Sequence, residues 1–204
     1  MNGTRAFSLI ELLVVISVII IMASFTAPSI ASVLRGNEMN RAEQLLVQQL
    51  ASARQTAIAR NRRVEVRFYS LINPDAPGAS KAFCAMQTFL IDENNRATAL
   101  GRVSKLPVTV LMNEAAANSS LLSVADKQWD ATTDPQISLP GVGTAYTTKT
   151  FQFRPDGSTS LSSANKWYVT MHSAREGATA ATPPPNFATI QVDPVSGAVR
   201  SYRP

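Results

Sequence analysis

The pattern of hydrophobic and polar positions divides this chain of 204 residues into three parts. In the first part, residues 7–34 are almost all apolar, and Glu11 is the only charged residue among them. The run from Leu12 to Leu34 has 23 residues without a charge. As a helix it would extend roughly 35 Å, enough to cross a bilayer core of about 30 Å. We therefore predict a transmembrane helix over residues 7–34.

The second part, residues 35–62, is predicted to be an amphipathic continuation of the helix. Its apolar residues fall on one face at spacings of three and four, as expected for a helix that packs on a globular domain. Asn40 and Glu43 have the spacing of a variant capping box, and Arg41 and Arg54 are expected to face water. The residues predicted to face the core are Ala42, Leu46, Leu50, Ala53 and Ala57.

The third part, residues 63–204, is predicted to be a β-rich globular domain because the apolar period changes to two. Val64, Val66 and Phe68 alternate with Glu65 and Arg67, a pattern typical of a half-buried strand. Residues 113–149 have weak periodicity, and we interpret them as an insertion or long surface loop. Further strands are predicted at residues 82–91, 106–112, 151–153 and 167–171, and a hairpin at 187–192 and 198–202.

The N-terminal residues resemble those of a known family. Residues 5–13, RAFSLIELL, resemble the class III signal of type IV pilins and type II secretion pseudopilins. The resemblance implies that prepilin peptidase cuts between Ala6 and Phe7, removes residues 1–6 as a leader and methylates the amine of Phe7. It also implies that Glu11 guides assembly. Ala6 stands where the family usually has glycine.

Two further stretches resemble a narrower group. Residues 50–64, LASARQTAIARNRRV, and residues 151–158, FQFRPDGS, are similar to the H-type minor pseudopilin of type II secretion and to related minor pilins. Residues 199–204 are similar to the D-type proteins of the Verru_Chthon cassette. The resemblance implies an α+β fold of the pilin type, in which a long N-terminal helix packs on a C-terminal antiparallel β-sheet.

Pro28 and Gly36 are the two helix-weakening residues of the predicted helix. Proline removes one backbone hydrogen bond and kinks a helix, and the Gly36-Asn37 pair is a weak point. We interpret residues 28–36 as the place where the helix bends or melts during assembly.

The charge distribution indicates an orientation. The leader with Arg5 is expected to stay in the cytoplasm, so that the chain crosses the inner membrane once and residues 63–204 lie in the periplasm. The net charge of +5 also permits nucleic-acid binding. That partner is not favoured, because the arginines of residues 41–63 lack the interleaved aromatic residues of a stacking platform.

The sequence contains no recognisable catalytic or metal-binding motif. Cys84 is the only cysteine and His172 the only histidine, fewer ligands than a zinc site needs. We interpret Cys84 as a buried small residue and His172 as structural. No phosphate-binding loop or nucleophile elbow is present. We therefore predict no catalytic residues, no metal, no cofactor and no enzyme activity.

These observations predict a pilin-like structural subunit, either a minor pseudopilin or a minor pilin. Its expected partners are prepilin peptidase, other pilin or pseudopilin subunits and the inner membrane. Part of the protein is expected in a periplasmic or surface fibre. The alternatives are a tip subunit that binds DNA or a secreted substrate, an ordinary signal-anchored periplasmic protein, and an anchored enzyme with an unfamiliar site.

Overall fold

The computed structural model describes residues 8–76 and 78–204, and for residues 23–35 it describes the backbone alone. Two compact units meet between Asn37 and Glu38. Ala6 and Phe7, the predicted cleavage point, lie outside the described residues, and so does the side chain of Pro28. The predicted boundaries at residues 6, 34 and 62 stay predictions.

The helix α1 (Leu9–Arg60) is continuous. Its backbone is helical at Asn40, so the prediction of a capping box at Asn40 and Glu43 is wrong. The carboxylate of Glu43 instead forms an ion pair with Arg203 near the C-terminus, at 2.5 Å. A capping box needs unsatisfied N–H groups at a helix start, and in the middle of α1 the helix itself satisfies them.

The end of α1 is determined by an asparagine. Asn61 has φ +50°, the left-handed conformation that terminates many helices. The N–H of Arg62 donates to the carbonyl of Ala57 at 3.1 Å, and the N–H of Asn61 donates to that of Ile58 at 3.2 Å. These two bonds are those of a Schellman motif. The chain therefore turns directly from α1 into the first strand.

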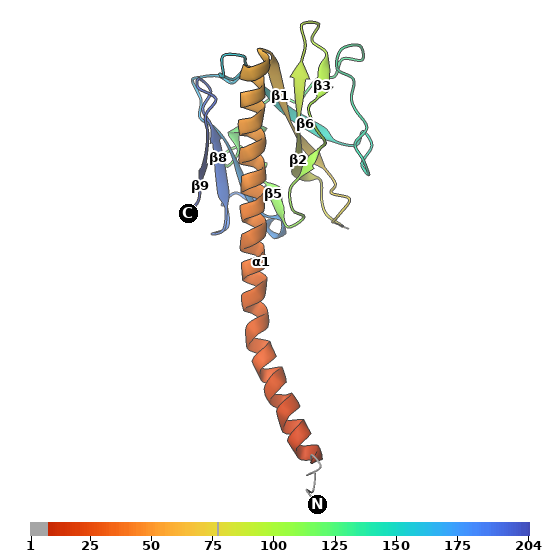
Figure 1. The fold of residues 1–204 in the computed structure, drawn as a ribbon, viewed down its shortest axis with the longest axis vertical. Helices are drawn as coiled ribbons and strands as arrows, with labels where there is room; N and C mark the ends of the chain where they lie inside the picture. The colour runs from red at the N-terminus through yellow and green to blue at the C-terminus, as the bar shows by residue number, and fades with distance from the viewer. Residues whose placement is uncertain (1–7, 77) are drawn as a thin grey trace, which may run out of the picture. The chain divides into compact units, whose positions relative to one another are not determined.

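The second unit contains one antiparallel sheet against which residues 38–60 of α1 pack (Figure 1). In the described residues its main strand order is β6-β1-β2-β5-β7-β8-β9, with β3 and β4 also paired to β2. The strands are β1 (Arg63–Leu71), β2 (Ala82–Ile91), β3 (Ala97–Ala99), β4 (Ser104–Lys105), β5 (Val110–Met112), β6 (Thr147–Phe153), β7 (Trp167–Ser173), β8 (Ala188–Val192) and β9 (Val199–Tyr202). The short helices are η1 (Ser120–Leu122) and η2 (Ala174–Glu176).

The predicted fold class is confirmed, and so are most of the predicted strands. The strand at residues 82–91 and the C-terminal hairpin form as expected, with β8 and β9 paired antiparallel. The strand predicted at 106–112 is only partly formed, because regular structure begins at Val110. Residues 107–110 instead form a turn, in which the N–H of Val110 donates to the carbonyl of Pro107.

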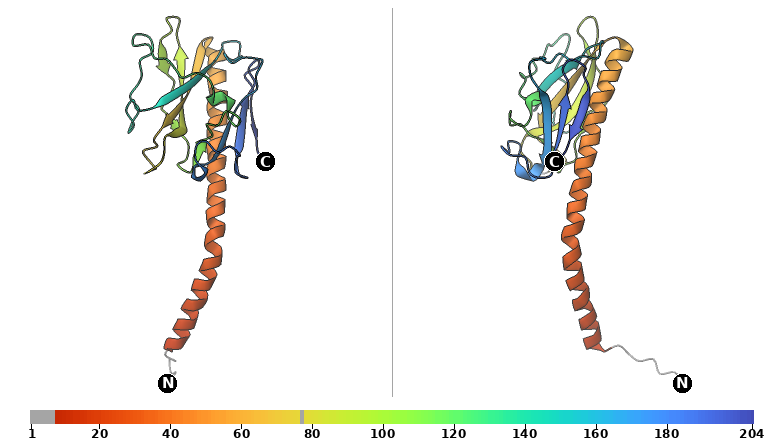
Figure 2. Two further views of the ribbon diagram at one scale, coloured as in Figure 1. Left: turned by 180° about the vertical axis from the view of Figure 1, so that it is seen from behind. Right: turned by 90° about the vertical axis from the view of Figure 1, so that its left-hand side faces the viewer.

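The core between α1 and the sheet is apolar. All five helix residues predicted to face the core are buried there, and Met39 joins them. Opposite them lie inward-facing strand residues from both halves of the sheet, including Val66, Phe153, Val169 and Ile190. The right-hand view of Figure 2 shows residues 38–60 along one face of the sheet.

The other face of the sheet is also covered, which the sequence did not indicate. Tyr69, Leu71, Cys84 and Ala85 form a second buried cluster there. Leu139 and Tyr146 cover them from residues 113–149, a segment in which η1 and the beginning of β6 are the named elements. The prediction that β1 is half-buried is therefore wrong, because its side chains are buried on both faces. The burial predicted for Cys84 is confirmed.

Candidate functional site

The first part of α1 exposes apolar side chains on every side. Each residue from Ser8 to Met22 is exposed, and the large apolar side chains range from 45% exposed at Val18 to 84% at Leu9. Exposed apolar surface of this extent marks a site of protein or membrane contact. Among the residues whose side chains are described, no helix presents an apolar stretch long enough to cross a membrane.

Glu11 lies in the first turn of this helix and forms a capping box with Ser8. The N–H of Ser8 donates to Oε2 of Glu11 at 3.0 Å, and the N–H of Glu11 donates to Oγ of Ser8 at 3.3 Å. The two residues therefore satisfy two of the N–H groups that a helix start leaves unpaired. This local role was not predicted, although the Ser-x-x-Glu spacing at residues 8–11 would have indicated it.

Of the other predicted site residues, Pro28 and Gly36 lie further along α1. Gly36 lies in the regular helix, and a Cβ added there would meet no atom within 4 Å. Helix formation through Pro28 and Gly36 neither supports nor excludes a bend during assembly. The predicted bend, the cleavage point and the assembly role of Glu11 all stay predictions.

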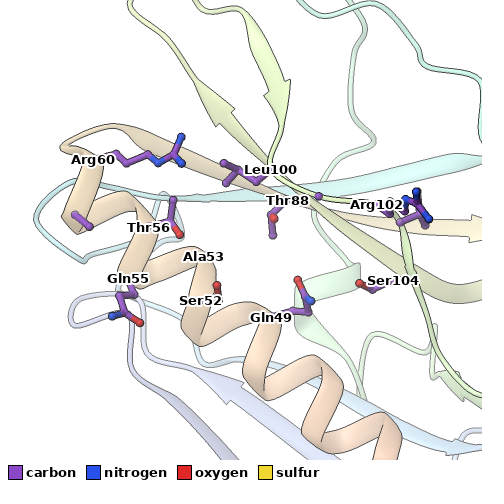
Figure 3. A pocket seen from close by; sticks show the side chains of 13 residues that line it. Gln49, Ser52, Ala53, Gln55, Thr56, Arg60, Thr88, Leu100, Arg102 and Ser104 are labelled. Carbon is purple, nitrogen blue, oxygen red and sulfur yellow. The ribbon is translucent and has the colours of Figure 1, made fainter.

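A polar groove lies in the second unit between α1 and the segment that joins β3 to β4 (Figure 3). Its volume is about 640 Å³. The side chains of Arg60 and Arg102 lie at opposite sides of the groove in Figure 3. Hydroxyl and amide groups dominate the remaining lining, which includes Gln49, Ser52, Gln55, Thr56, Thr88 and Ser104. Such a surface suits polar contacts rather than an apolar ligand.

A buried cluster of four charges joins β1 to the 113–149 segment. Nε of Arg67 lies 2.6 Å from Oε1 of Glu65, and Nη2 of Arg67 lies 2.7 Å from Oδ2 of Asp134. Nζ of Lys127 lies 2.8 Å from Oε1 of Glu65 and 2.7 Å from Oδ2 of Asp134. The guanidinium carbon of Arg67 lies 3.6 Å from the ring centre of Phe89. Two cations and two anions balance, as burial of charge requires.

Sequence reasoning missed this cluster. Lys127 and Asp134 are separated from β1 by more than fifty positions, and no local period links them to it. The available signal was the charged pair Glu65 and Arg67 within a strand that is otherwise hydrophobic. Charged side chains in such a place need partners when a second layer covers them.

Arg54 holds two turns at the end of the domain. Its Nε donates to the carbonyl oxygen of Gly157 at 3.2 Å and to that of Ser196 at 2.9 Å. The prediction that Arg54 faces water holds only in part, because the residue is half-buried and its Nε is hydrogen-bonded to these two turns. The two turns lie so close that a Cβ added at Gly197 would come within 2.1 Å of the Gly157 carbonyl oxygen.

His172 is buried in a polar setting beneath the C-terminal loops. Its Nε2 lies 3.1 Å from Nδ2 of Asn113, and its Nδ1 lies 3.0 Å from the carbonyl oxygen of Ser173. The carbonyl can only accept, so Nδ1 carries the proton and Nε2 accepts from Asn113. Burial lowers the pKa of His172 below its ordinary value. Among the described residues, no group of three or more possible metal ligands occurs.

The fold defines the class of this protein: a long N-terminal helix packs its C-terminal half on an antiparallel sheet, as in pilin-like subunits. Residues 42–175 match the family described as "Type II transport protein GspH". This match covers about two thirds of the chain, and the protein belongs to that family of pseudopilins. The family is one of structural subunits and is not a known family of enzymes.

Two solved structures of the minor pseudopilin EpsH from the type 2 secretion system of Vibrio cholerae also resemble this chain. One is 10% identical with a TM-score of 0.45, and the likeness covers 82% of this chain and 98% of that one. The other is 11% identical with a TM-score of 0.46, covering 82% and 95%. No conclusion rests on likenesses this weak. A search of curated proteins found no match.

Proposed function

We propose that this protein is a minor pseudopilin that assembles through its N-terminal helix into the fibre of a type II secretion system. Membership of the GspH family supports this function. The observation that carries the assembly role is the exposure of every residue from Ser8 to Met22. So much apolar surface is unfavourable in water, and either a lipid bilayer or the equivalent helices of neighbouring subunits would remove it from water.

Processing would precede assembly. In this proposal prepilin peptidase removes residues 1–6 and methylates the new amine of Phe7. The helix stays in the inner membrane with the C-terminal domain in the periplasm until the subunit enters the fibre. Mass spectrometry of the protein purified from cells that contain the peptidase should give a chain that begins at N-methylated Phe7. A chain that begins at Met1, or beyond Ala31, would contradict this processing.

Glu11 would have two roles: it caps the helix within its own subunit, and it fixes the axial register between neighbouring subunits. The capping bond from Ser8 uses Oε2, and Oε1 can accept a second hydrogen bond. We assign that position to the methylated amine of Phe7 on a neighbouring subunit. A carboxylate without a partner is strongly penalised in an apolar bundle, so only the register that pairs these groups would be stable.

Two substitutions separate the roles of Glu11. Glu11→Gln removes the charge, but glutamine also serves at this position of a capping box. Ser8→Ala removes the cap and keeps the charge. We expect Glu11→Gln to reach the membrane and to be incorporated into fibres at a small fraction of the wild-type level, whereas Ser8→Ala is incorporated nearly normally. Immunoblots of sheared fibres and of membranes measure both. Normal incorporation of Glu11→Gln would remove the proposed pairing.

One observation favours a second candidate function, binding of single-stranded nucleic acid. The face of β7, β8 and β9 turned away from α1 carries Tyr168, Arg200 and Tyr202, with Lys166 beside them. Aromatic rings and cations together on a sheet can stack bases and contact phosphates. A binding series at rising salt would test it, because phosphate contacts weaken steeply with salt concentration. Absence of binding at low salt would exclude this function.

A further inference from the structure

A second cavity lies on the face of the sheet turned away from α1. Its volume is about 540 Å³, within the range of about 300–1,000 Å³ that is common for small-molecule sites. The sheet contributes Leu71 of β1, Gln87 of β2 and Lys105 of β4 to the lining. The remaining lining comes from residues 101–103, and from residues 137–140 and 142 of the 113–149 segment. The cavity therefore exists because that segment folds back over β1 and β2.

The interior of this cavity is aliphatic. Leu71 and Leu139 are buried, and the further aliphatic lining residues are Val103, Ile137, Pro140 and Val142. Gln87 of β2 is a polar lining residue, and both ends of its side-chain amide are hydrogen-bonded. Its Oε1 accepts from the hydroxyl of Tyr69 at 3.2 Å, and its Nε2 donates to the carbonyl of Gly101 at 2.7 Å. The interior thus favours an apolar body, and the exposed Ser138 adds a hydroxyl group to the lining.

Charge at the cavity is positive. Arg102 is exposed, and within residues 8–76 and 78–204 its side chain has no recorded hydrogen bond or ion pair. Lys105 pairs with Asp75 at 2.9 Å, but the two side chains are 34% and 61% exposed, and such pairs are weak. No acidic residue is part of the described lining. Arg102 is therefore available to form an ion pair with an anionic group of a ligand.

We propose that this cavity binds a small organic anion with an apolar body, of the class of medium-chain alkyl or aryl carboxylates. The apolar body lies against Leu71, Leu139 and Val142, and the carboxylate pairs with Arg102. No residue of α1 lines this cavity among the described residues. A test of ligand binding here is therefore separate from a test of the proposed assembly function.

The probe for this site is decanoate that carries a photoreactive diazirine at its apolar end. The full chain is held in nanodiscs of zwitterionic phospholipid, so that the lipid itself adds no net charge. We expect saturable labelling within residues 71–72 or 137–142. Excess decanoate should displace the probe, and decyltrimethylammonium, with the same chain and the opposite charge, should not.

Two variants locate the charge contact. Arg102→Glu should weaken binding about tenfold or more, as loss of a charge-assisted hydrogen bond implies. Arg154→Glu makes the same charge change at an exposed position after β6, outside the cavity lining, and should leave the affinity within about twofold of wild type. Val103→Trp should fill the cavity and abolish labelling. If that variant does not fold by circular dichroism, the surface variant Arg102→Glu still decides the question.

Several results would overturn the proposal. Labelling confined to residues 8–22 would mean that the probe only follows the apolar helix. Equal displacement by decyltrimethylammonium, or equal affinity of Arg102→Glu and wild type, would remove the anion contact. A leucine–aspartate peptide that binds at residues 137–142 when decanoate does not would assign the cavity to a protein partner instead.

Discussion

The two faces of the β-sheet are buried by opposite means. On one face, α1 covers the sheet mainly with apolar side chains, among them Leu46 and Leu50, and adds a few polar contacts such as the ion pair between Glu43 and Arg203. On the other face, residues 113–149 are held by the four charges around Arg67 and by the aromatic pair Tyr69 and Tyr146, whose ring centres are 5.2 Å apart. A regular helix can therefore be held mainly by apolar packing, which has no preferred direction, whereas the irregular segment adds specific charged and aromatic contacts to its apolar ones.

The largest expected effect comes from breaking the charge cluster with Arg67→Met. Removal of one cation leaves Glu65 and Asp134 buried with only Lys127 to balance them, and such a loss costs about 3–5 kcal/mol. Thermal unfolding followed by circular dichroism should show a midpoint lower by about 6–20 °C. The control is Lys105→Met, which removes an exposed ion pair and should change the free energy of unfolding by less than about 1 kcal/mol.

A similar or smaller loss in the free energy of unfolding is expected from a substitution in the apolar core between α1 and the sheet. Leu46→Ala truncates a fully buried side chain, and the lost transfer energy and the new cavity together cost about 2–5 kcal/mol. Gln48→Ala, at an exposed position of the same helix, should change the stability by less than about 0.5 kcal/mol. If Leu46→Ala were as mild as its control, the apolar face would contribute little to holding α1.

The difference between the faces also explains what the sequence could reveal. The apolar face was predictable because Ala42, Leu46 and Leu50 repeat at helical spacing and Val64 and Val66 alternate, and periodicity is local information. The charge cluster was not predictable, because Arg67 meets Lys127 and Asp134 through a loop without a period. The cavity formed by residues 137–142 was missed for the same reason. Of the N-terminal site, the sequence indicated Glu11, and the Ser-x-x-Glu spacing of residues 8–11 was an available signal for its capping bond with Ser8.

An intermediate effect is expected at Arg54 of α1, whose side chain is hydrogen-bonded to two turns of the C-terminal domain. Arg54→Met removes the hydrogen bonds to the carbonyls of Gly157 and Ser196. At a partly exposed site this should cost about 1–2 kcal/mol. Arg41→Met, an exposed arginine on the same helix, should be nearly neutral. Equal unfolding midpoints of the two variants would show that apolar packing alone holds this face.

The smallest expected effect is a dependence of the thermal stability on pH, through His172 of β7. Because burial lowers the pKa of His172 in the folded state, the unfolded chain binds the proton more readily. The stability from neutral His172 is therefore fully present above the ordinary pKa of about 6.5 and is lost as the pH falls toward the folded pKa. Protonation of Nε2 would also remove the acceptor of the hydrogen bond from the Asn113 amide, because the protonated nitrogen is itself a donor. The negative charge of Glu176 acts in the opposite direction and raises the pKa of His172. Wild type should thus lose more thermal stability between about pH 7.5 and about pH 5.5 than His172→Gln, which cannot titrate. An equal loss in both proteins would mean that the neutral form of His172 contributes nothing to the stability of the folded protein.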